Sequence, residues 1–180
     1  MQFVIPMAGS GTRFKKKGFT TPKPLIKAGK TTFLEGVTNQ FTKLNDVLFI
    51  CNENHTSNES QSFVDIINII KKNSKIVSIK PHKLGPVETI MQAEKYINKE
   101  KPVLISYCDC ISIFEEKKFY SYLKNNGDVD GLIFYYTGFH PHLRRSQNHA
   151  YLKFDKEVIV DIKEKKSFTP NPLNEPASSG

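Results

Sequence analysis

Short apolar runs alternate with amphipathic helical stripes through the first 136 residues of the chain, and this alternation constrains the fold more than any other feature. The expected strands are residues 2–7, 47–51, 75–79, 103–107 and 132–136. The expected helices between them are residues 32–41, 62–72, 87–97 and 113–123. In the second and third of these, apolar residues follow the i, i+3, i+4, i+7 spacing of one helix face. A β-α-β alternation requires right-handed crossovers that place helices on the faces of a parallel sheet. The pattern therefore predicts a three-layer α/β/α fold with a mostly parallel central sheet.

The alternation stops after residue 136, and the remaining chain has a different character. Residues 150–154 and 157–162 predict a hairpin around Asp155 and Lys156, whereas residues 169–180 are rich in Pro, Ser and Asn without periodicity. At 180 residues the chain has the length of about one domain. We therefore expect a single domain, with an α/β core over residues 1–136 and a β-rich segment over residues 137–180. Because the last residues are small and form no closing element, we also expect this domain to be truncated at its C-terminus.

The net charge of +8 comes almost entirely from lysine, since only three of the 26 basic residues are arginines. A lysine-rich surface favours solubility, and it also suits an acidic partner, either nucleic acid or a phosphorylated small molecule. Arginine is the usual reader of base edges, so sequence-specific nucleic-acid binding is not expected. No apolar run approaches the roughly 20 residues of a membrane span. Three cysteines and no secretory signal pattern lead us to expect reduced thiols and a cytoplasmic location.

A glycine-bearing loop follows the first expected strand, where residues 9–14 read Gly-Ser-Gly-Thr-Arg-Phe. A dinucleotide-binding fingerprint needs glycine at position 14, so Phe14 excludes that motif. Backbone N–H groups at such a strand end still offer hydrogen-bond donors to a phosphate or a base edge. Arg13 and residues 15–17, which are all lysine, add positive charge beside it. We therefore expect a phosphate-binding loop, the alternative being an ordinary basic surface loop.

Two prolines hold Lys23 on a stiff stretch of backbone, since Pro22 and Pro24 fix φ on either side of it. A rigid lysine shortly after a phosphate loop suits charge neutralisation of a polyphosphate. Residues 28–31, Ala-Gly-Lys-Thr, mimic the end of a P-loop, but Pro24 stands where that motif needs glycine. We predict a turn at residues 28–31 instead.

Asp109 lies between Cys108 and Cys110, just after the apolar run of residues 103–107. A carboxylate at the carboxyl end of a central strand is well placed to hold Mg²⁺ over the sheet. A soft metal site would need four ligands, and the two cysteines are too few. The alternative role for Asp109 is a cap on the following helix.

The glycine loop, the Pro-Lys-Pro element and the aspartate after a strand together resemble the family of sugar-1-phosphate nucleotidyltransferases, whose pattern is G-x-G-T-R followed by K-P. Residues 85–89, Gly-Pro-Val-Glu-Thr, look like that family's base-side loop, which leads into a helix. Glu164 and Lys165 look like its E-K pair near the acceptor sugar. The resemblance runs in the right order along nearly the whole chain. It implies a Rossmann-like fold with a β-rich C-terminal part that binds the acceptor.

The resemblance also implies a role for each matching residue. Two loops would bind the nucleotide through Ala8, Gly9, Ser10, Gly11, Thr12, Gly85 and Thr89. The implied catalytic residues are Arg13, which would meet the β,γ-phosphates, and Lys23, which would bridge the α-phosphate and the incoming phosphate. Asp109 would hold Mg²⁺, the implied cofactor, and Glu164 with Lys165 would bind the acceptor. The family's usual second metal-binding aspartate cannot be placed in this sequence.

The implied reaction transfers a nucleoside monophosphate from an NTP to a sugar 1-phosphate and releases pyrophosphate, as a step toward surface polysaccharide or capsule precursors. The acceptor phosphate is already a nucleophile near neutral pH, so the chemistry needs positioning and charge neutralisation rather than a general base. The histidines are accordingly expected on the solvated surface: His55, His82, His140, His142 and His149.

A basic nucleic-acid-binding domain is the least favoured alternative, and two others stay open from the sequence. One is a cytidylyltransferase that acts on a non-sugar phosphate such as phosphocholine. The other is a non-catalytic nucleotide-binding regulatory domain, which would keep the loop and lose the metal site. The joint presence of Lys23 and Asp109 argues against the second. The expected partners are an NTP and a small phosphorylated acceptor, without nucleic acid or membrane, and a homo-oligomer is compatible with them.

Overall fold

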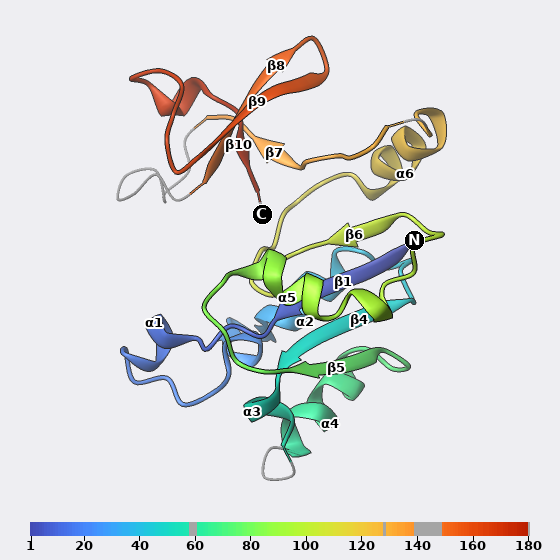
Figure 1. Ribbon diagram of the computed structural model, residues 1–180, viewed down its shortest axis with the longest axis vertical. Coiled ribbons are helices and arrows are strands. Elements are labelled where there is room, and N and C mark those ends of the chain that lie inside the picture. The colour runs from blue at the N-terminus through green and yellow to red at the C-terminus, as the bar shows by residue number, and fades with distance from the viewer. Residues whose placement is uncertain (58–60, 128, 139–148, 180) are drawn as a thin grey trace. The chain divides into compact units, whose positions relative to one another are not determined.

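The computed structural model describes residues 1–57, 61–127, 129–138 and 149–179 of the chain (Figure 1). The chain divides into two compact units, Met1–Glu116 and Lys117–Gly180, and each is described by itself. The division lies earlier in the chain than the change of character after residue 136. The expectation of a single domain stays a prediction.

A four-stranded parallel sheet forms the centre of the first unit, in the order β5-β4-β1-β6 (Figure 1). Its strands are β1 (Gln2–Met7), β4 (Val47–Asn52), β5 (Lys75–Ile79) and β6 (Val103–Ile105). In the register of this sheet, Phe3 of β1 lies opposite Val47 of β4 and Leu104 of β6. Every residue of β1 and β4 is buried, as expected for strands that are covered on both faces. The first four strands expected from the apolar runs are therefore confirmed, although β6 ends two residues earlier than expected.

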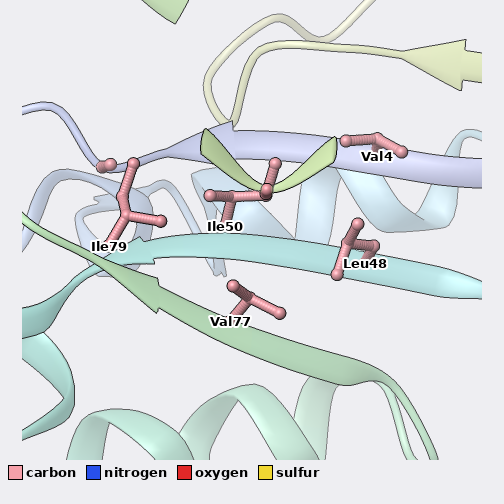
Figure 2. Close-up of a cluster of buried hydrophobic side chains, with 7 residues drawn as sticks. Val4, Leu48, Ile50, Val77 and Ile79 are labelled. Carbon is pink, nitrogen blue, oxygen red and sulfur yellow. The ribbon is translucent and has the colours of Figure 1, made fainter. Parts of the chain in front are cut away.

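Helices cover both faces of this sheet (Figure 1). The face beneath α5 (Pro86–Gln92) carries a buried cluster, drawn in Figure 2: Val4, Ala8, Leu48, Ile50, Val77, Ile79 and Ala93. On the opposite face lie α2 (Phe33–Asn39) and α4 (Gln61–Ile70), which contact each other. There Phe3 meets Phe41 edge-on, with 5.1 Å between ring centroids. Successive side chains of β1 thus enter opposite layers, and the three-layer α/β/α fold is confirmed.

Shorter elements complete the first unit: α1 (Thr12–Lys15), η1 (Lys23–Leu25), β2 (Lys27–Ala28), β3 (Thr31–Thr32), α3 (Glu53–Thr56) and η3 (Glu94–Tyr96). β2 and β3 form an antiparallel hairpin in which Gly29 has a φ of 69°, so the turn predicted at residues 28–31 is confirmed. α2 begins at a capping box, in which Glu35 N donates to Thr32 Oγ1 and Thr32 N donates to Glu35 Oε2.

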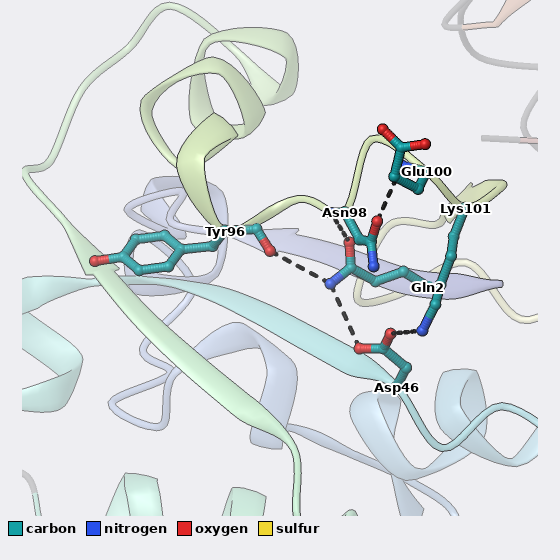
Figure 3. Close-up of polar contacts among 6 residues, drawn as sticks. All are labelled: Gln2, Asp46, Tyr96, Asn98, Glu100 and Lys101. Carbon is teal, nitrogen blue, oxygen red and sulfur yellow. Dashed lines mark hydrogen bonds and ion pairs between the residues drawn. The ribbon is translucent and has the colours of Figure 1, made fainter.

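A polar network fixes the amino ends of the strands, at the edge of the sheet opposite to their carboxyl ends (Figure 3). Gln2 Nε2 donates to Tyr96 O and to Asp46 Oδ1, and Gln2 Oε1 accepts a hydrogen bond from Asn98 N. Lys101 pairs with Asp46 at 3.4 Å. The buried amide of Gln2 therefore has partners on both of its polar atoms, as burial of a polar group requires.

An antiparallel sheet forms the second unit, in the order β7-β10-β8-β9 (Figure 1). The elements of this part of the chain are α6 (Glu116–Asn125), β7 (Tyr135–Tyr136), β8 (Ala150–Asp155), β9 (Val158–Glu164), η5 (Pro172–Asn174) and β10 (Ala177–Ser178). β8 and β9 form the predicted hairpin, with Lys156 in the left-handed region at a φ of 55°. The β-rich C-terminal part is thus confirmed.

Residues 132–136 do not form a fifth parallel strand, and that prediction is wrong. Tyr135 and Tyr136 pair antiparallel with Ser178 and Ala177, and Leu132 and Ile133 are exposed. A short apolar run does not specify its partner. The alternation alone could therefore not distinguish a fifth crossover strand from one that pairs with the C-terminal segment.

Candidate active site

The loop after β1 starts from a buried position at the carboxyl edge of the parallel sheet. Ala8 belongs to the cluster beneath α5, and its carbonyl accepts a hydrogen bond from Asn52 Nδ2 at 3.1 Å. Asn52 is the last residue of β4, so this bond joins the ends of two neighbouring strands. Beyond the exposed Gly9, Gly11 precedes α1 with a φ of 63°, a left-handed conformation that favours glycine. The expected nucleotide loop is therefore fixed at its first residue.

Phe14, the residue that excludes the dinucleotide fingerprint, anchors the other end of this loop. Its ring meets the rings of Phe19 and Phe33 edge-on, with centroids 5.6 and 6.3 Å apart. Phe33 is the first residue of α2, so the aromatic contact ties the loop to that helix. Thr12 and Arg13 of α1 remain exposed. The loop is thus an anchored turn that presents a guanidinium to solvent, and phosphate binding by this loop stays a prediction.

The structure brings Lys23 and Asp109 together in an ion pair. Lys23 Nζ and Asp109 Oδ2 lie 2.7 Å apart, and the two side chains are 30% and 33% exposed. Gly11 lies beside them, because a side chain at that position would contact Lys23 Cβ at 3.8 Å. Asp109 follows β6, which pairs with β1 in the sheet. The glycine loop, the Pro-Lys-Pro element and the segment after β6 thus meet at one edge of the sheet.

Asp109 is not a helix cap. It lies in a turn after β6, and the next helix, α6, begins at Glu116. The cap alternative is therefore wrong, and the carboxylate forms an ion pair with Lys23 instead.

Two buried cysteines near this ion pair remain protonated. Burial raises the pKa of Cys108 to about 12, an effect that the neighbouring Lys23 ammonium partly offsets. Burial, assisted by Cys108, also raises the pKa of Cys51 to about 12. The thiolate is the form that binds metals, so these thiols do not favour a soft metal at neutral pH.

The donor groups at Asp109 fit Mg²⁺ rather than an all-protein metal cage. Within the described ranges, no group of three or more His, Cys, Asp or Glu residues lies where it could hold a metal ion. Mg²⁺ is commonly held by one or two carboxylates together with substrate phosphates and water. The half-buried carboxylate of Asp109 satisfies that requirement when a nucleotide supplies the remaining oxygens.

The expected base-side loop is closed by a hydrogen-bonded chain through His82. Leu84 N donates to His82 Nδ1 at 3.2 Å, so His82 Nε2 carries the proton and donates to Thr89 Oγ1 at 3.1 Å. Thr89 Oγ1 in turn donates to Gly85 O at 3.3 Å. Gly85 has a φ of 93° and immediately precedes α5. The structure therefore places Gly85 at the exposed turn and Thr89 beneath it, where its hydroxyl supports the loop.

The expectation that the histidines are solvated is wrong for His82 and His55. Both are half-buried, and the His82 ring is also hydrogen-bonded within its loop. The His55 ring lies 5.4 Å from the ring of Phe63. Burial, followed by the charge of Lys15, holds the pKa of His55 below its usual value. His149 is half-buried too, with Nδ1 3.2 Å from Ser178 O, whereas residues 140 and 142 lie outside the described ranges.

Sequence reasoning missed Asn52 and His82, which both shape this edge of the sheet. Asn52 carried a usable signal, since it is the first polar residue after the apolar run of residues 47–51 at the end of a predicted parallel strand. His82 carried no such signal, because neither its spacing nor its neighbours match a motif.

The expected acceptor pair lies in the second unit. Glu164 is the last residue of β9, and Lys165 follows with a φ of 57°. Their side chains are mostly exposed and form an ion pair of 3.1 Å. Glu175 organises the segment that follows, because its carboxylate accepts hydrogen bonds from Phe168 N and from the N and Oγ1 atoms of Thr169.

The glycine loop, Lys23 and Asp109 all lie within a stretch of the chain that matches a known protein family. Residues 3–147 match the family model of the MobA-like NTP transferase domain. The chain belongs to the MobA-like NTP transferase family. This NTP transferase is therefore a nucleotidyltransferase-type enzyme, and the resemblance identified from its loop motifs is confirmed.

Solved structures share the fold of this NTP transferase at low sequence identity. The nucleoside-diphosphate-sugar pyrophosphorylase from Vibrio cholerae aligns with a TM-score of 0.63 at 19% identity, over 98% of this chain and 72% of that one. The inositol-1-phosphate CTP transferase from T. maritima aligns with a TM-score of 0.67 at 14% identity, over 99% and 68% of the two chains. The UTP-bound UGPase from Acinetobacter baumannii aligns with a TM-score of 0.64 at 15% identity, over 98% of this chain and 73% of that one. At these identities the likeness establishes the fold.

Two further searches gave negative results for the NTP transferase. No curated protein matches the chain. Among the residues that the structure describes, no helix has the length and apolar character needed to cross a membrane.

Proposed function

We propose that this NTP transferase moves a nucleoside monophosphate from an NTP to a sugar 1-phosphate and releases pyrophosphate, as a step toward precursors of a surface polysaccharide or capsule. The observation that carries the proposal is the ion pair of Lys23 and Asp109 beside Gly11. A binding module would need the glycine loop, but it would not need a rigid lysine and a carboxylate at the same point. The proposal is also supported by the sugar-nucleotide pyrophosphorylase from Vibrio cholerae, which has the same fold.

The proposed reaction is an in-line displacement at the α-phosphorus of the NTP. An oxygen of the acceptor phosphate forms a bond to the α-phosphorus. The bond between the α-phosphorus and the oxygen that bridges it to the β-phosphorus breaks, and pyrophosphate leaves with that electron pair. Backbone N–H groups of residues 9–12 hold the nucleotide, and Arg13 meets the β,γ-phosphates. Lys23 bridges the α-phosphate and the incoming phosphate, and Glu164 with Lys165 bind the acceptor. The residues of the chain contribute positioning and charge neutralisation.

Asp109 is the proposed residue that holds Mg²⁺, jointly with the triphosphate. When bound, this ion neutralises negative charge on the phosphate oxygens. The half-buried setting of Asp109 strengthens its interaction with any cation relative to bulk water.

The nucleotide can be identified by thermal denaturation, and we expect one NTP to stabilise the protein far more than the others. Stabilisation grows as RT ln(1 + [L]/Kd), which is about 2.7 kcal/mol at 100 times Kd. For a chain of this size that corresponds to a Tm increase of roughly 5–10 °C. The panel contains CTP, UTP, dTTP, GTP and ATP, each with Mg²⁺ and each repeated with EDTA. A Tm that no NTP changes would contradict nucleotide binding.

The acceptor class follows from pyrophosphate release with the preferred NTP. Sugar 1-phosphates should support release, whereas phosphocholine should not. Release with phosphocholine alone would favour the non-sugar cytidylyltransferase. Nucleotide binding without release for any acceptor would favour the non-catalytic domain.

Arg13→Ala is expected to lower kcat/KM for the NTP by roughly 10²-fold, the scale of losing one preorganised charge contact. Because Arg13 is exposed on α1 and outside the core, the variant should keep the wild-type Tm. Lys72→Ala removes another exposed cation, in the turn after α4, and serves as the matched control with unchanged kinetics. Equal kinetics for the two variants would remove Arg13 from the site.

A further inference from the structure

Gln40 connects the end of α2 to the segment that carries Asp109. Its Nε2 donates to Cys110 O at 3.1 Å, and its Oε1 accepts from Ser112 N at 2.5 Å. The same Nε2 lies 3.3 Å from Val37 O of its own helix. The Gln40 amide thus donates one hydrogen bond to the backbone of residues 110–112 and accepts one from it, as the backbone of a neighbouring strand would.

This segment lies beyond the reach of the strand ladder. β6 ends at Ile105, and its pairing with β1 stops at the same residue. After Ser106 N, which donates to Val4 O at 3.3 Å, the chain leaves the sheet. The backbone on the C-terminal side of Asp109 is therefore held from α2.

A second contact between α2 and this segment involves Gly36. A side chain at that position would overlap the end of the Ile111 side chain, so the glycine leaves room for Ile111 against the helix. Ile111 lies between the two residues that Gln40 binds. Since Leu34 and Val37 of α2 are fully buried, the helix is a rigid support.

The same helix also supports Lys23. Phe33 N, at the start of α2, donates to Ile26 O at 3.0 Å, just after η1. Both partners of the Lys23–Asp109 ion pair are thus attached to one helix, Lys23 near its first turn and Asp109 near its last.

We propose that Gln40 is a positioning residue that sets the Asp109 carboxylate for metal and nucleotide binding, an inference that rests on the proposed role of Asp109. The role requires an uncharged amide, because one partner is a carbonyl acceptor and the other is an N–H donor. Glutamate has the same shape and keeps the acceptor for Ser112, but it loses the donor and places negative charge against Cys110 O. Leucine loses both bonds and leaves two backbone groups without their partner.

The test compares Gln40→Leu, Gln40→Glu and, as a matched control, Asn39→Leu, which changes an exposed amide at the adjacent position of the same helix. Mn²⁺ binding in the presence of NTP is measured by electron paramagnetic resonance. The Mg²⁺ concentration for half-maximal pyrophosphate release is measured in parallel. Removing a direct outer partner of a metal ligand typically costs 10–100-fold in affinity. Gln40 acts through the backbone beside Asp109 and not on the carboxylate itself, so we take the lower end of this range. We expect both Gln40 variants to need at least about 10-fold more metal in each assay, with the control unchanged.

The outcomes separate this inference from the proposed function. A purely structural role would lower Tm in Gln40→Leu and leave the metal concentration of Gln40→Glu at the wild-type value, and that result would overturn the inference. Asp109→Asn is assayed alongside. If it shifts metal binding and neither Gln40 variant does, only the inference fails. If Asp109→Asn binds Mn²⁺ as the wild type does, the proposed function of Asp109 and the inference fail together.

Discussion

Lys23→Met is expected to reduce turnover by roughly 10³-fold while leaving NTP affinity within a few-fold of the wild type. The reason is geometric: Lys23 is the cation paired with Asp109, on backbone stiffened by Pro22 and Pro24. Methionine keeps much of the length of the side chain and removes the charge. Because the lysine side chain is 30% exposed, the substitution should not disturb the core.

The measurement is pyrophosphate release together with NTP binding by calorimetry. Lys27→Met, an exposed lysine in β2, is the matched control and should behave as the wild type. Loss of turnover with retained NTP binding separates a role in the reaction from a role in nucleotide capture. Normal turnover would mean that the Pro-Lys-Pro element is only a structural turn.

Asp109→Asn is expected to nearly abolish activity at ordinary Mg²⁺ concentrations, with partial recovery at high Mg²⁺. Asparagine keeps the size and hydrogen-bonding capacity of the side chain but lacks the charge that attracts the ion. Pyrophosphate release is titrated against Mg²⁺ for the variant and for Asp46→Asn. Asp46 also pairs with a lysine, but at the amino edge of the sheet (Figure 3), so its Mg²⁺ profile should match the wild type.

The double variant of Lys23 and Asp109 adds a check on their coupling. Residues in direct contact show non-additive effects, so the combined loss should be smaller than the product of the two single losses. Fully multiplicative losses would show that the two side chains act independently. An Asp109→Asn titration identical to the wild type would show that the metal is held elsewhere.

The sequence predicted the parallel sheet well because buried parallel strands read as continuous apolar runs. β1, β4, β5 and β6 all arise from such runs. The same signal failed for residues 132–136, where the pairing partner, β10, is two residues long and lies in a stretch without periodicity. Periodicity reports which residues are apolar, and it does not report which strand they meet.

The site was only partly predictable for a related reason. Lys23 and Asp109 each stood out through local chemistry, a rigid cation and a carboxylate after a strand. Their ion pair depends on β6 pairing with β1, which no local pattern encodes. Gln40 was missed because an uncharged amide near a helix end matches no motif, although its two hydrogen bonds reach across the fold.

The strand order β5-β4-β1-β6 has a consequence for how the chain folds. β1 can pair with β4 once residue 52 has been synthesised, but its other neighbour, β6, comes about twice as far along the chain. Closing longer loops costs more entropy, and contacts between distant segments slow folding. A nascent chain can therefore assemble β1, β4 and β5 first, with one side of β1 still unpaired. The arrival of β6 closes that edge and, in the same step, brings the carboxylate of Asp109 to a lysine that was made far earlier.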